Sequence, residues 1–417
     1  MKSNATLISS GDSGDGGDEP EGGDTPSTPT IGPNAQLTEF LTGIADAIRE
    51  KTGTSDPINP QDFATTIAEM QTGGNVESNP DEMLKAMVEG TILTFNVSTI
   101  SSIGSNAFTN SFLIDVNLPT CTTIGTSAFT YCSNLLKFNG PMCTSIGYCA
   151  FQSCYNLIQF SAPELSYIGE GAFSSCSNFT LCSFPKCSFV GQLAFAYTKI
   201  SNISLPQCTS LSRQAFAFCN YLTTVSDSNF PLVTTFSDTF TQCSSLESVN
   251  LTNLSSTYGT FYGCSKLANV SLPNCSSIGY NTFYQCYSLS SVYIPNCTYI
   301  SYYGFYQCSA MTSISIPKCS YIGSSAFYNC YKLSSISLPV CSYIGSRAFY
   351  YCSALSQLYL MSTSVVSIHN SQAFMYTPMQ YSSYLGYFGS IYVPASLLAS
   401  YKANTYWSYY SSRFVGV

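Results

Sequence analysis

From residue 92 onward, apolar and polar residues follow one pattern that repeats about every 22 residues. The pattern, L-P-x-C-(S/T)-x-I-G-x-x-A-F-x-x-C-x-x-L-x-x-(I/V)-x, is clear in IPKCSYIGSSAFYNCYKLSSISL (316–338). Such self-similarity is typical of a solenoid of stacked coils. One phenylalanine marks each of thirteen units at intervals of 21 to 25 residues: Phe108, Phe129, Phe151, Phe173, Phe195, Phe216, Phe240, Phe261, Phe283, Phe305, Phe327, Phe349 and Phe374.

Each repeat position has a predicted place in the coil. One short parallel strand per coil is expected, as in SSVYI (290–294), with Val292 and Ile294 facing the core. The following proline, such as Pro295, lacks an N–H and ends the pairing. The glycine of the I-G pair, such as Gly279, is predicted to permit a tight turn with positive φ. The marker phenylalanines are predicted to form a ladder in the core, represented by Phe283, Phe305, Phe327 and Phe349.

The 20 cysteines fall mainly into two columns with the same period. Ten lie three residues after a marker phenylalanine and eight lie eight residues before one, while Cys149 and Cys182 lie outside both columns. Where a cysteine is absent, its slot holds Ser111, Thr198, Leu165 or Leu232. Disulfides, metal ligands and buried free thiols are the three possible interpretations.

Buried free thiols fit the pattern best. Zinc needs four converging ligands, but there is no C-x-x-C pair and His369 is the sole histidine. Stacked cysteines would be parallel and about 4.8 Å apart, beyond the usual disulfide Cβ separation. We therefore expect no metal and no other cofactor, with scattered disulfides as the alternative. The cysteines assigned to the core include Cys286, Cys297, Cys308 and Cys319.

The residues before the repeats have a different composition. The first 34 are rich in Gly, Asp, Ser and Pro, and bury too little apolar surface to offset the cost of ordering. Two amphipathic patterns, QLTEFLTGIADAIRE and PQDFATTIAEMQ, then predict a helical hairpin. The predicted segments are a disordered acidic linker (1–34), a helical hairpin for attachment or oligomerisation (35–72), a connector (73–91), the repeats (92–377) and a C-terminal cap (378–417).

Charge and hydropathy exclude several partners. Residues 1–100 carry a net charge of −12 and residues 101–417 a net charge of +4. This surplus is too sparse for a groove that binds nucleic acid. No apolar run has the length of a signal peptide core or of a membrane span, so we expect no membrane span and synthesis in the cytoplasm.

The candidate catalytic residues are few. His369 is expected to be a surface residue, and no Cys–His dyad or phosphate-binding G-x-x-x-x-G-K motif is present. The six carboxylates of the repeats show no spacing that predicts a glycosidase pair. We therefore expect no enzymatic activity and no catalytic residue, and a glycan-degrading enzyme is the disfavoured alternative.

Tyrosine is the residue type that suggests a function. The chain has 32 tyrosines, of which several recur directly after the marker phenylalanine or six residues before it. A face rich in Tyr and Ser offers rigid contact area and hydrogen bonds, and tyrosine rings can stack on sugars. The alternative is that these tyrosines only cover the edges of the coils. The predicted binding residues are Tyr284, Tyr287, Tyr299, Tyr302, Tyr306, Tyr321, Tyr328, Tyr343 and Tyr350.

The combination of I-G-x-x-A-F-x-x-C-x-x-L with L-P-x-C over residues 92–377 resembles the BspA-like leucine-rich repeat family. This resemblance implies a solenoid of about 13 coils. The ending IYVPASLLASYKANTYWSYYSSRF (391–414) resembles the segment that caps such repeats with a strand and a short helix. The predicted hairpin resembles, over about 35 residues, a segment of bacteriophage structural proteins.

Together, these resemblances imply a bacteriophage virion protein, such as a tail-fibre protein for receptor binding and host attachment. Its expected partner is a host cell-surface glycan or protein, which the face rich in Tyr and Ser would bind. Residues 1–72 would contact other virion proteins or form a homo-oligomer. The expected location is the virion surface. The alternatives are a bacterial cell-surface adhesin of the same fold and a structural virion decoration protein that binds no receptor.

Overall fold

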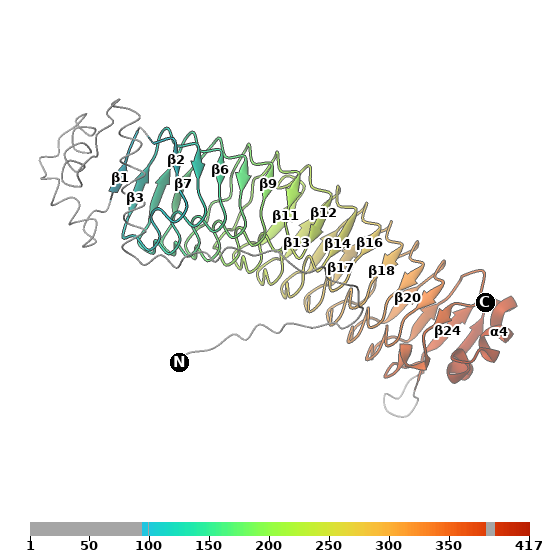
Figure 1. Cartoon of the computed structure of the whole chain (residues 1–417). Helices are drawn as coiled ribbons and strands as arrows, with labels where there is room; N and C mark the ends of the chain where they lie inside the picture. Colours follow the sequence, from blue (N-terminus) through green and yellow to red (C-terminus); the bar gives the residue numbers. More distant parts are fainter. Residues whose placement is uncertain (1–93, 99, 381–387) are drawn as a thin grey trace, which may run out of the picture. The chain divides into compact units, whose positions relative to one another are not determined.

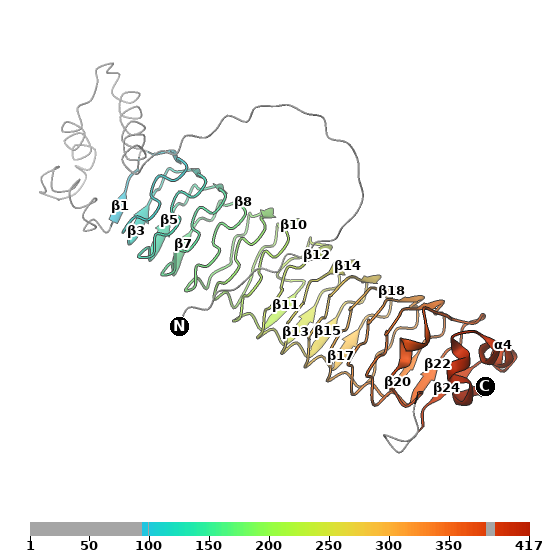
Figure 2. The same cartoon turned by 60° about the horizontal axis from the view of Figure 1, so that its bottom comes forward.

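The computed structural model describes residues 94–98, 100–380 and 388–417. The predicted linker, hairpin and connector (1–91) lie outside these residues. Within the described part, the chain winds into about 14 coils that stack one on the next (Figure 1, Figure 2). The strands pair in parallel with equivalent strands of neighbouring coils. The repeat solenoid predicted from the 22-residue period is confirmed.

One strand of three or four residues starts most coils, usually with its middle residue buried. These strands form three four-stranded sheets, and single bridges from Ser183 to Ser204 and from Tyr293 to Ser315 mark the coils between them. The sheets consist of β1 (Thr94–Asn96), β3 (Asp115–Asn117), β5 (Lys137–Asn139) and β7 (Gln159–Ser161); β11 (Thr224–Ser226), β13 (Ser248–Asn250), β15 (Asn269–Ser271) and β17 (Ser291–Tyr293); and β20 (Ser335–Ser337), β22 (Gln357–Tyr359), β24 (Ser390–Val393) and β25 (Phe414–Gly416).

Most coils contain a second strand, so the expectation of one strand per coil was incomplete. In this strand the isoleucine of the I-G pair is extended and buried, as Ile278 and Ile322 show. Two residues are too few to give a visible alternation in the sequence. These strands form a sheet of β2 (Ser102–Ile103), β4 (Thr123–Ile124), β6 (Ser145–Ile146), β8 (Tyr167–Ile168), β9 (Phe189–Val190) and β10 (Ser210–Leu211), and another of β12 (Thr235–Ser237), β14 (Ser256–Tyr258), β16 (Ser277–Ile278), β18 (Tyr299–Ile300), β19 (Tyr321–Ile322), β21 (Tyr343–Ile344) and β23 (Ser367–Ile368).

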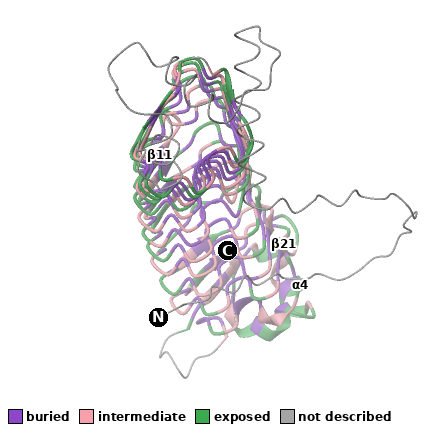
Figure 3. Cartoon of the chain, turned by 60° about the vertical axis from the view of Figure 1, so that its left-hand side comes forward, coloured by how far each residue is buried: buried purple, intermediate pink, exposed green. Residues whose placement is uncertain are grey.

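The marker phenylalanines form one unbroken stack through the core. From Phe108 to Phe374, successive ring centroids are 5.1–5.9 Å apart and successive ring planes differ by 2–17°. Each buried side chain of this size stabilises the fold by about 1.5–3 kcal/mol. Buried residues recur at the same positions and run as bands from coil to coil (Figure 3). The structure buries Phe283, Phe305, Phe327 and Phe349 completely.

All 20 cysteines are free thiols and all are buried, among them Cys286, Cys297, Cys308 and Cys319. The ten cysteines after the marker phenylalanine donate to the carbonyl oxygen of the marker phenylalanine in the preceding coil, at 2.9–3.2 Å. The eight of the other column donate to the carbonyl oxygen two residues later, at 3.3–3.5 Å. The thiols are therefore packing groups that also give backbone carbonyls a weak hydrogen bond.

Two repeat positions that hold another residue in place of cysteine differ in whether that residue is buried. The hydroxyl of Thr198 donates to the carbonyl oxygen of Phe195, so a hydroxyl also meets a backbone carbonyl at this position. Leu232, by contrast, was wrongly assigned to a core slot: it is 49% exposed, and Val233 is buried instead. The inward residue lies seven residues before Phe240 instead of the usual eight, and Leu254 lies in the same way before Phe261, so the stretch that precedes these two marker phenylalanines is one residue shorter.

The glycines of the I-G pair are required for a different reason from the one predicted. Their φ angles are not positive; positive φ occurs two residues before and after most marker phenylalanines, as at Asn281 (55°) and Gln285 (60°). The glycines are instead places where backbones of adjacent coils approach closely. A Cβ atom at Gly169 would lie 2.6 Å from the carbonyl carbon of Gly147.

The last coil is covered by η2 (Ala395–Leu397), α4 (Leu398–Ala403) and η3 (Trp407–Arg413), which follow η1 (Ser371–Phe374) and β24. Trp407 is fully buried, its ring centroid is 5.7 Å from that of Phe374, and its indole N–H donates to the carbonyl oxygen of Val366 at 2.6 Å. The ring of Tyr410 meets that of Phe374 edge-on. The phenylalanine stack therefore ends against aromatic side chains rather than solvent.

Replacing Gly169 with alanine should destabilise the solenoid by about 1–3 kcal/mol, because the new methyl group overlaps the backbone of the preceding coil. Gly104→Ala is the matched control, since a Cβ there has no atom of the described residues within 4 Å. The thermal and urea unfolding midpoints of both variants test this. Equal midpoints for the two variants would contradict a close-approach role for Gly169.

The thiols should resist alkylation in the native protein. Burial raises the pKa of Cys208 and Cys297 to about 11, and the thiolate is the reactive form. Raising the pH from about 7 to about 9 should therefore add little labelling by iodoacetamide, whereas an exposed thiol with a pKa of about 8.5 would react much faster. Mass spectrometry should show all 20 thiols labelled only after unfolding. Rapid labelling of several thiols in the native state would contradict this.

Candidate functional site

Five tyrosines that directly follow a marker phenylalanine form a stack on the outside of the coils. We call Tyr262, Tyr284, Tyr306, Tyr328 and Tyr350 the first tyrosine row. Successive ring centroids lie 4.9, 4.6, 4.9 and 5.0 Å apart, and the ring planes differ by only 3–15°. These rings are half-buried, whereas the adjacent marker phenylalanines are buried. The first tyrosine row thus repeats, on the outside of the coils, the regular stacking of the marker phenylalanines in the core.

The stacking determines which parts of the row a ligand can reach. Neighbouring rings cover both faces of each interior ring, so ring edges and hydroxyls remain accessible. Among the described residues, the hydroxyls of Tyr262, Tyr284, Tyr306 and Tyr328 have no hydrogen-bond partner. Burial raises the pKa of Tyr284 to about 12, with the neighbouring tyrosines adding to this effect. The hydroxyls therefore remain protonated hydrogen-bond donors at neutral pH.

Other tyrosines border the first row. The ring of Tyr303 meets the edges of Tyr284 and Tyr306, with centroids 6.3 and 5.5 Å away. Tyr287 and Tyr331, each four residues after a marker phenylalanine, are 44% and 46% exposed. The row and its borders form a mainly aromatic surface that displays hydroxyl groups.

Tyr299, Tyr321 and Tyr343 form a second tyrosine row, on strands β18, β19 and β21. Their centroids are 4.6 and 4.9 Å apart. The hydroxyl of Tyr343 shares a hydrogen bond with Nδ1 of His369 at 3.2 Å. Burial, followed by a hydrogen bond with Tyr302, raises the pKa of Tyr321. The second row is shorter than the first, and more of its hydroxyls have partners.

The tyrosines predicted from the sequence thus belong to two separate rows. Tyr284, Tyr306, Tyr328 and Tyr350 lie in the first row with Tyr287 at its border, while Tyr302 lies beside the second. Among the described residues, no ring contact joins the two rows. Tyr262 belongs to the first row but was not predicted; its position directly after Phe261 could have identified it.

The serine and threonine hydroxyls are less available than expected. In ten coils the residue after the cysteine slot donates to the carbonyl oxygen of the equivalent residue in the preceding coil, as Thr298 does to Ser276 at 3.1 Å. These hydroxyls stabilise the stack and can only accept a bond from a ligand. The phenol hydroxyls of Tyr262, Tyr284 and Tyr306, with that of Tyr328, remain available as donors on this part of the surface.

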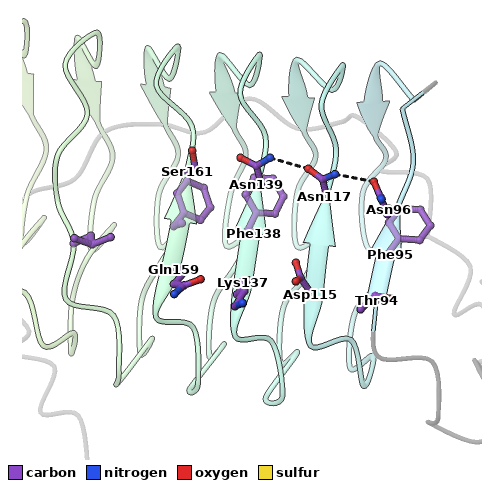
Figure 4. Close-up of a pocket in the computed structure, with 12 residues that line it drawn as sticks. Thr94, Phe95, Asn96, Asp115, Asn117, Lys137, Phe138, Asn139, Gln159 and Ser161 are labelled. Carbon is purple, nitrogen blue, oxygen red and sulfur yellow. Dashed lines mark hydrogen bonds between the residues drawn. The ribbon is translucent and has the colours of Figure 1, made fainter. Parts of the chain in front are cut away.

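A separate shallow hollow of about 750 Å³ lies over β1, β3, β5 and β7 (Figure 4). Asn117 donates to Asn96, and Asn139 to Asn117, each at 2.7 Å, which forms a ladder of side-chain amides. Asp115 and Lys137 are register neighbours in the outward row beside it. The sequence analysis missed this surface. Asparagines recurring at the last position of three successive strands were the available signal.

Three of the six carboxylates of the repeats make structural contacts. Glu164 pairs with Lys186, and Asp238 accepts from Nε of Arg213 at 2.8 Å. Asp227 accepts from the backbone N–H of Thr252 at 2.8 Å. No three metal-ligating side chains come together in the described part of the chain, and none of its helices has the length and apolarity that crossing a membrane requires. Nothing in this arrangement indicates catalysis.

Several solved structures are similar to this chain. A leucine-rich repeat protein from Bacteroides ovatus is 22% identical, with 71% of this chain and 88% of that chain covered and a TM-score of 0.42. A leucine rich cell surface protein from Faecalibacterium prausnitzii is 20% identical, with 66% and 85% covered and a TM-score of 0.37. The pneumococcal vaccine antigen PcpA is 16% identical, with 78% and 77% covered and a TM-score of 0.44. No curated protein matches the chain.

The family comparison covers most of the solenoid. The model of the BspA type leucine rich repeat region, which contains six copies of the repeat, matches residues 101–223, 144–259, 188–310 and 255–381. These overlapping matches span well over half of the chain and include every marker phenylalanine from Phe108 to Phe374. The chain therefore belongs to the BspA-type leucine-rich repeat family.

Proposed function

We propose that this protein is a non-enzymatic recognition protein that binds a cell-surface protein or glycan through its first tyrosine row. The observation that carries the proposal is the line of four phenol hydroxyls that have no partner among the described residues, on rings held 4.6–4.9 Å apart by stacking. Rings that are already ordered lose little conformational entropy when a ligand binds. Tyrosine also combines apolar contact area with a hydrogen-bonding group.

The proposed site of display is the surface of a phage particle, with residues 1–72 attached to other virion proteins or to copies of the same chain. This part of the proposal rests on the resemblance of the hairpin sequence to bacteriophage structural proteins. Display on a bacterial cell as an adhesin is the alternative, because the solenoid sequence alone suits either setting.

The two settings predict different targets. A virion protein should bind intact bacteria, whereas an adhesin of a host-associated bacterium should bind animal cells or their matrix. Fluorescently labelled full-length protein can be tested by flow cytometry against a panel of bacteria and cultured epithelial cells. Binding to neither group would favour a structural decoration protein. Release of reducing ends from the bound cells would contradict a non-enzymatic role.

Removing the four free hydroxyls should weaken cell binding and leave the fold intact. The variant changes Tyr262, Tyr284, Tyr306 and Tyr328 to Phe, which keeps the ring stack. At about 0.5–1.5 kcal/mol per hydrogen bond, we expect at least about a tenfold loss of affinity. Flow cytometry on the cells bound by the unchanged protein measures this loss.

The matched control carries four Tyr→Phe changes at exposed tyrosines of the earlier coils, at Tyr131, Tyr155, Tyr197 and Tyr221. Both variants should unfold at the same temperature as the parent protein. Unchanged cell binding by the first-row variant, or an equal loss in the control, would remove the first row as the binding surface.

A further inference from the structure

The acidic residues of this chain end at Glu247. Residues 248–417 contain no Asp or Glu and six basic residues, a formal charge of +6. Residues 101–247 contain six acidic and four basic residues, a formal charge of −2. The basic residues of the later part are Lys266, Lys318, Lys332, Arg347, Lys402 and Arg413.

The acid-free part coincides with the first tyrosine row. In the earlier coils, the residue after the marker phenylalanine is Thr, Gln, Ser or Ala, and the first tyrosine at this position is Tyr262. From there to Tyr350 the row is unbroken. Two independent properties, the loss of carboxylates and the gain of phenol hydroxyls, thus change within the same coil.

One of the basic residues lies beside a ring of the row, and two others are close to the row in the sequence. The guanidinium carbon of Arg347 lies 5.7 Å from the ring centroid of Tyr350. Lys266 and Lys332 occupy one repeat position, five residues after their marker phenylalanine, and both are exposed. Lys332 directly follows Tyr331, which borders the row. The other basic residues are Lys318, which donates to the side chain of Asn296, and the cap residues Lys402 and Arg413.

Building on the proposed function, we propose that the ligand of the first tyrosine row is an acidic polysaccharide that lies along the stack. Phenol hydroxyls and basic side chains donate to carboxylate or other anionic groups and to sugar hydroxyls. No carboxylate of this part of the chain repels such a polymer. The row offers one tyrosine per coil with ring centroids 4.6–5.0 Å apart, so it suits a linear ligand with a short regular repeat.

The same geometry argues against single-stranded nucleic acid, which is also a polyanion. Proteins bind its bases by stacking them on open aromatic faces, and its phosphates by dense basic coverage. Here, neighbouring tyrosines cover the faces of the interior rings, and six basic residues are spread over residues 248–417. A polysaccharide with one anionic group per sugar or per disaccharide needs neither feature.

The test measures the affinity of the full-length chain for four polymers: polygalacturonate, dextran sulfate, neutral dextran and poly(dT). We expect polygalacturonate or dextran sulfate to bind at least about tenfold more tightly than dextran and poly(dT), and this preference to fall with added NaCl because salt screens surface charges. If polygalacturonate binds more tightly than dextran sulfate, the protein prefers carboxylate groups; the opposite order shows a preference for sulfate groups. With oligogalacturonates, affinity should rise with length until the ligand spans Tyr262 to Tyr350, and then level off.

Two variants with three substitutions each show which basic residues contribute to binding of the anionic polymer. Changing Lys266, Lys332 and Arg347 to Gln should weaken binding of the anionic polymer by about tenfold. The control makes the same charge change in the earlier coils, with Lys186, Lys199 and Arg213 changed to Gln, and should bind like the parent chain. Unfolding midpoints show whether each variant is folded.

Three results would overturn this inference: equal affinity for dextran and the anionic polymers, tightest binding of poly(dT), or equal losses in both triple variants. A chain that binds cells through the first row but binds neither anionic polymer would contradict the acidic ligand alone and leave the proposed function standing. A chain that binds polygalacturonate equally well after the four Tyr→Phe changes would show that the basic residues act without the row.

Discussion

The structure depends on one constraint: each coil lies directly on the coil before it at the spacing of adjacent strands. Inter-coil hydrogen bonds hold this spacing within the strands and also outside them, as from the N–H of Phe129 to the carbonyl oxygen of Ala150 at 2.7 Å. Each residue therefore meets the equivalent residues of the neighbouring coils at about 4.8 Å. A position can be filled repeatedly only by a residue that packs well against copies of itself.

The recurring residues meet this condition in different ways. Phenylalanine rings stack with small interplanar angles and fill the core. Glycine allows close backbone approach, as at Gly169. Cysteine is small and mainly apolar, but its thiol can still donate to a carbonyl oxygen, as Cys286 does to Phe261 at 3.2 Å. Valine would not provide this donor, and serine would give up apolar packing. The two columns of cysteines thus arise because both positions have the same packing requirement.

This constraint also explains which features could be predicted from the sequence. A periodic fold repeats its requirements, so the period, the phenylalanine stack and the solenoid were evident without coordinates. Features without a visible pattern were missed, such as the two-residue strands and the positive φ at Asn281 and Gln285, where the residue types vary from coil to coil. The tyrosine columns were visible, but which ring faces and hydroxyls stay free depends on rotamers and neighbours. The Asn96–Asn117–Asn139 ladder was missed because three residues make a short column.

The proposed recognition surface follows from the same rule applied outside the core. Because the coils stack, any residue that is repeated on the outside of the solenoid forms a row. Stacking also gives many of the polar groups in such a row a hydrogen-bond partner in the neighbouring coil. Hydroxyls close to the backbone, such as that of Thr298, reach the preceding coil and donate to its carbonyls. Tyrosine carries its hydroxyl on a longer, rigid ring, so the rings can stack on one another while the hydroxyls extend past the backbone that would bind them. Among the repeated polar residues of this fold, tyrosine is therefore the type best suited to display an ordered line of unpaired donors.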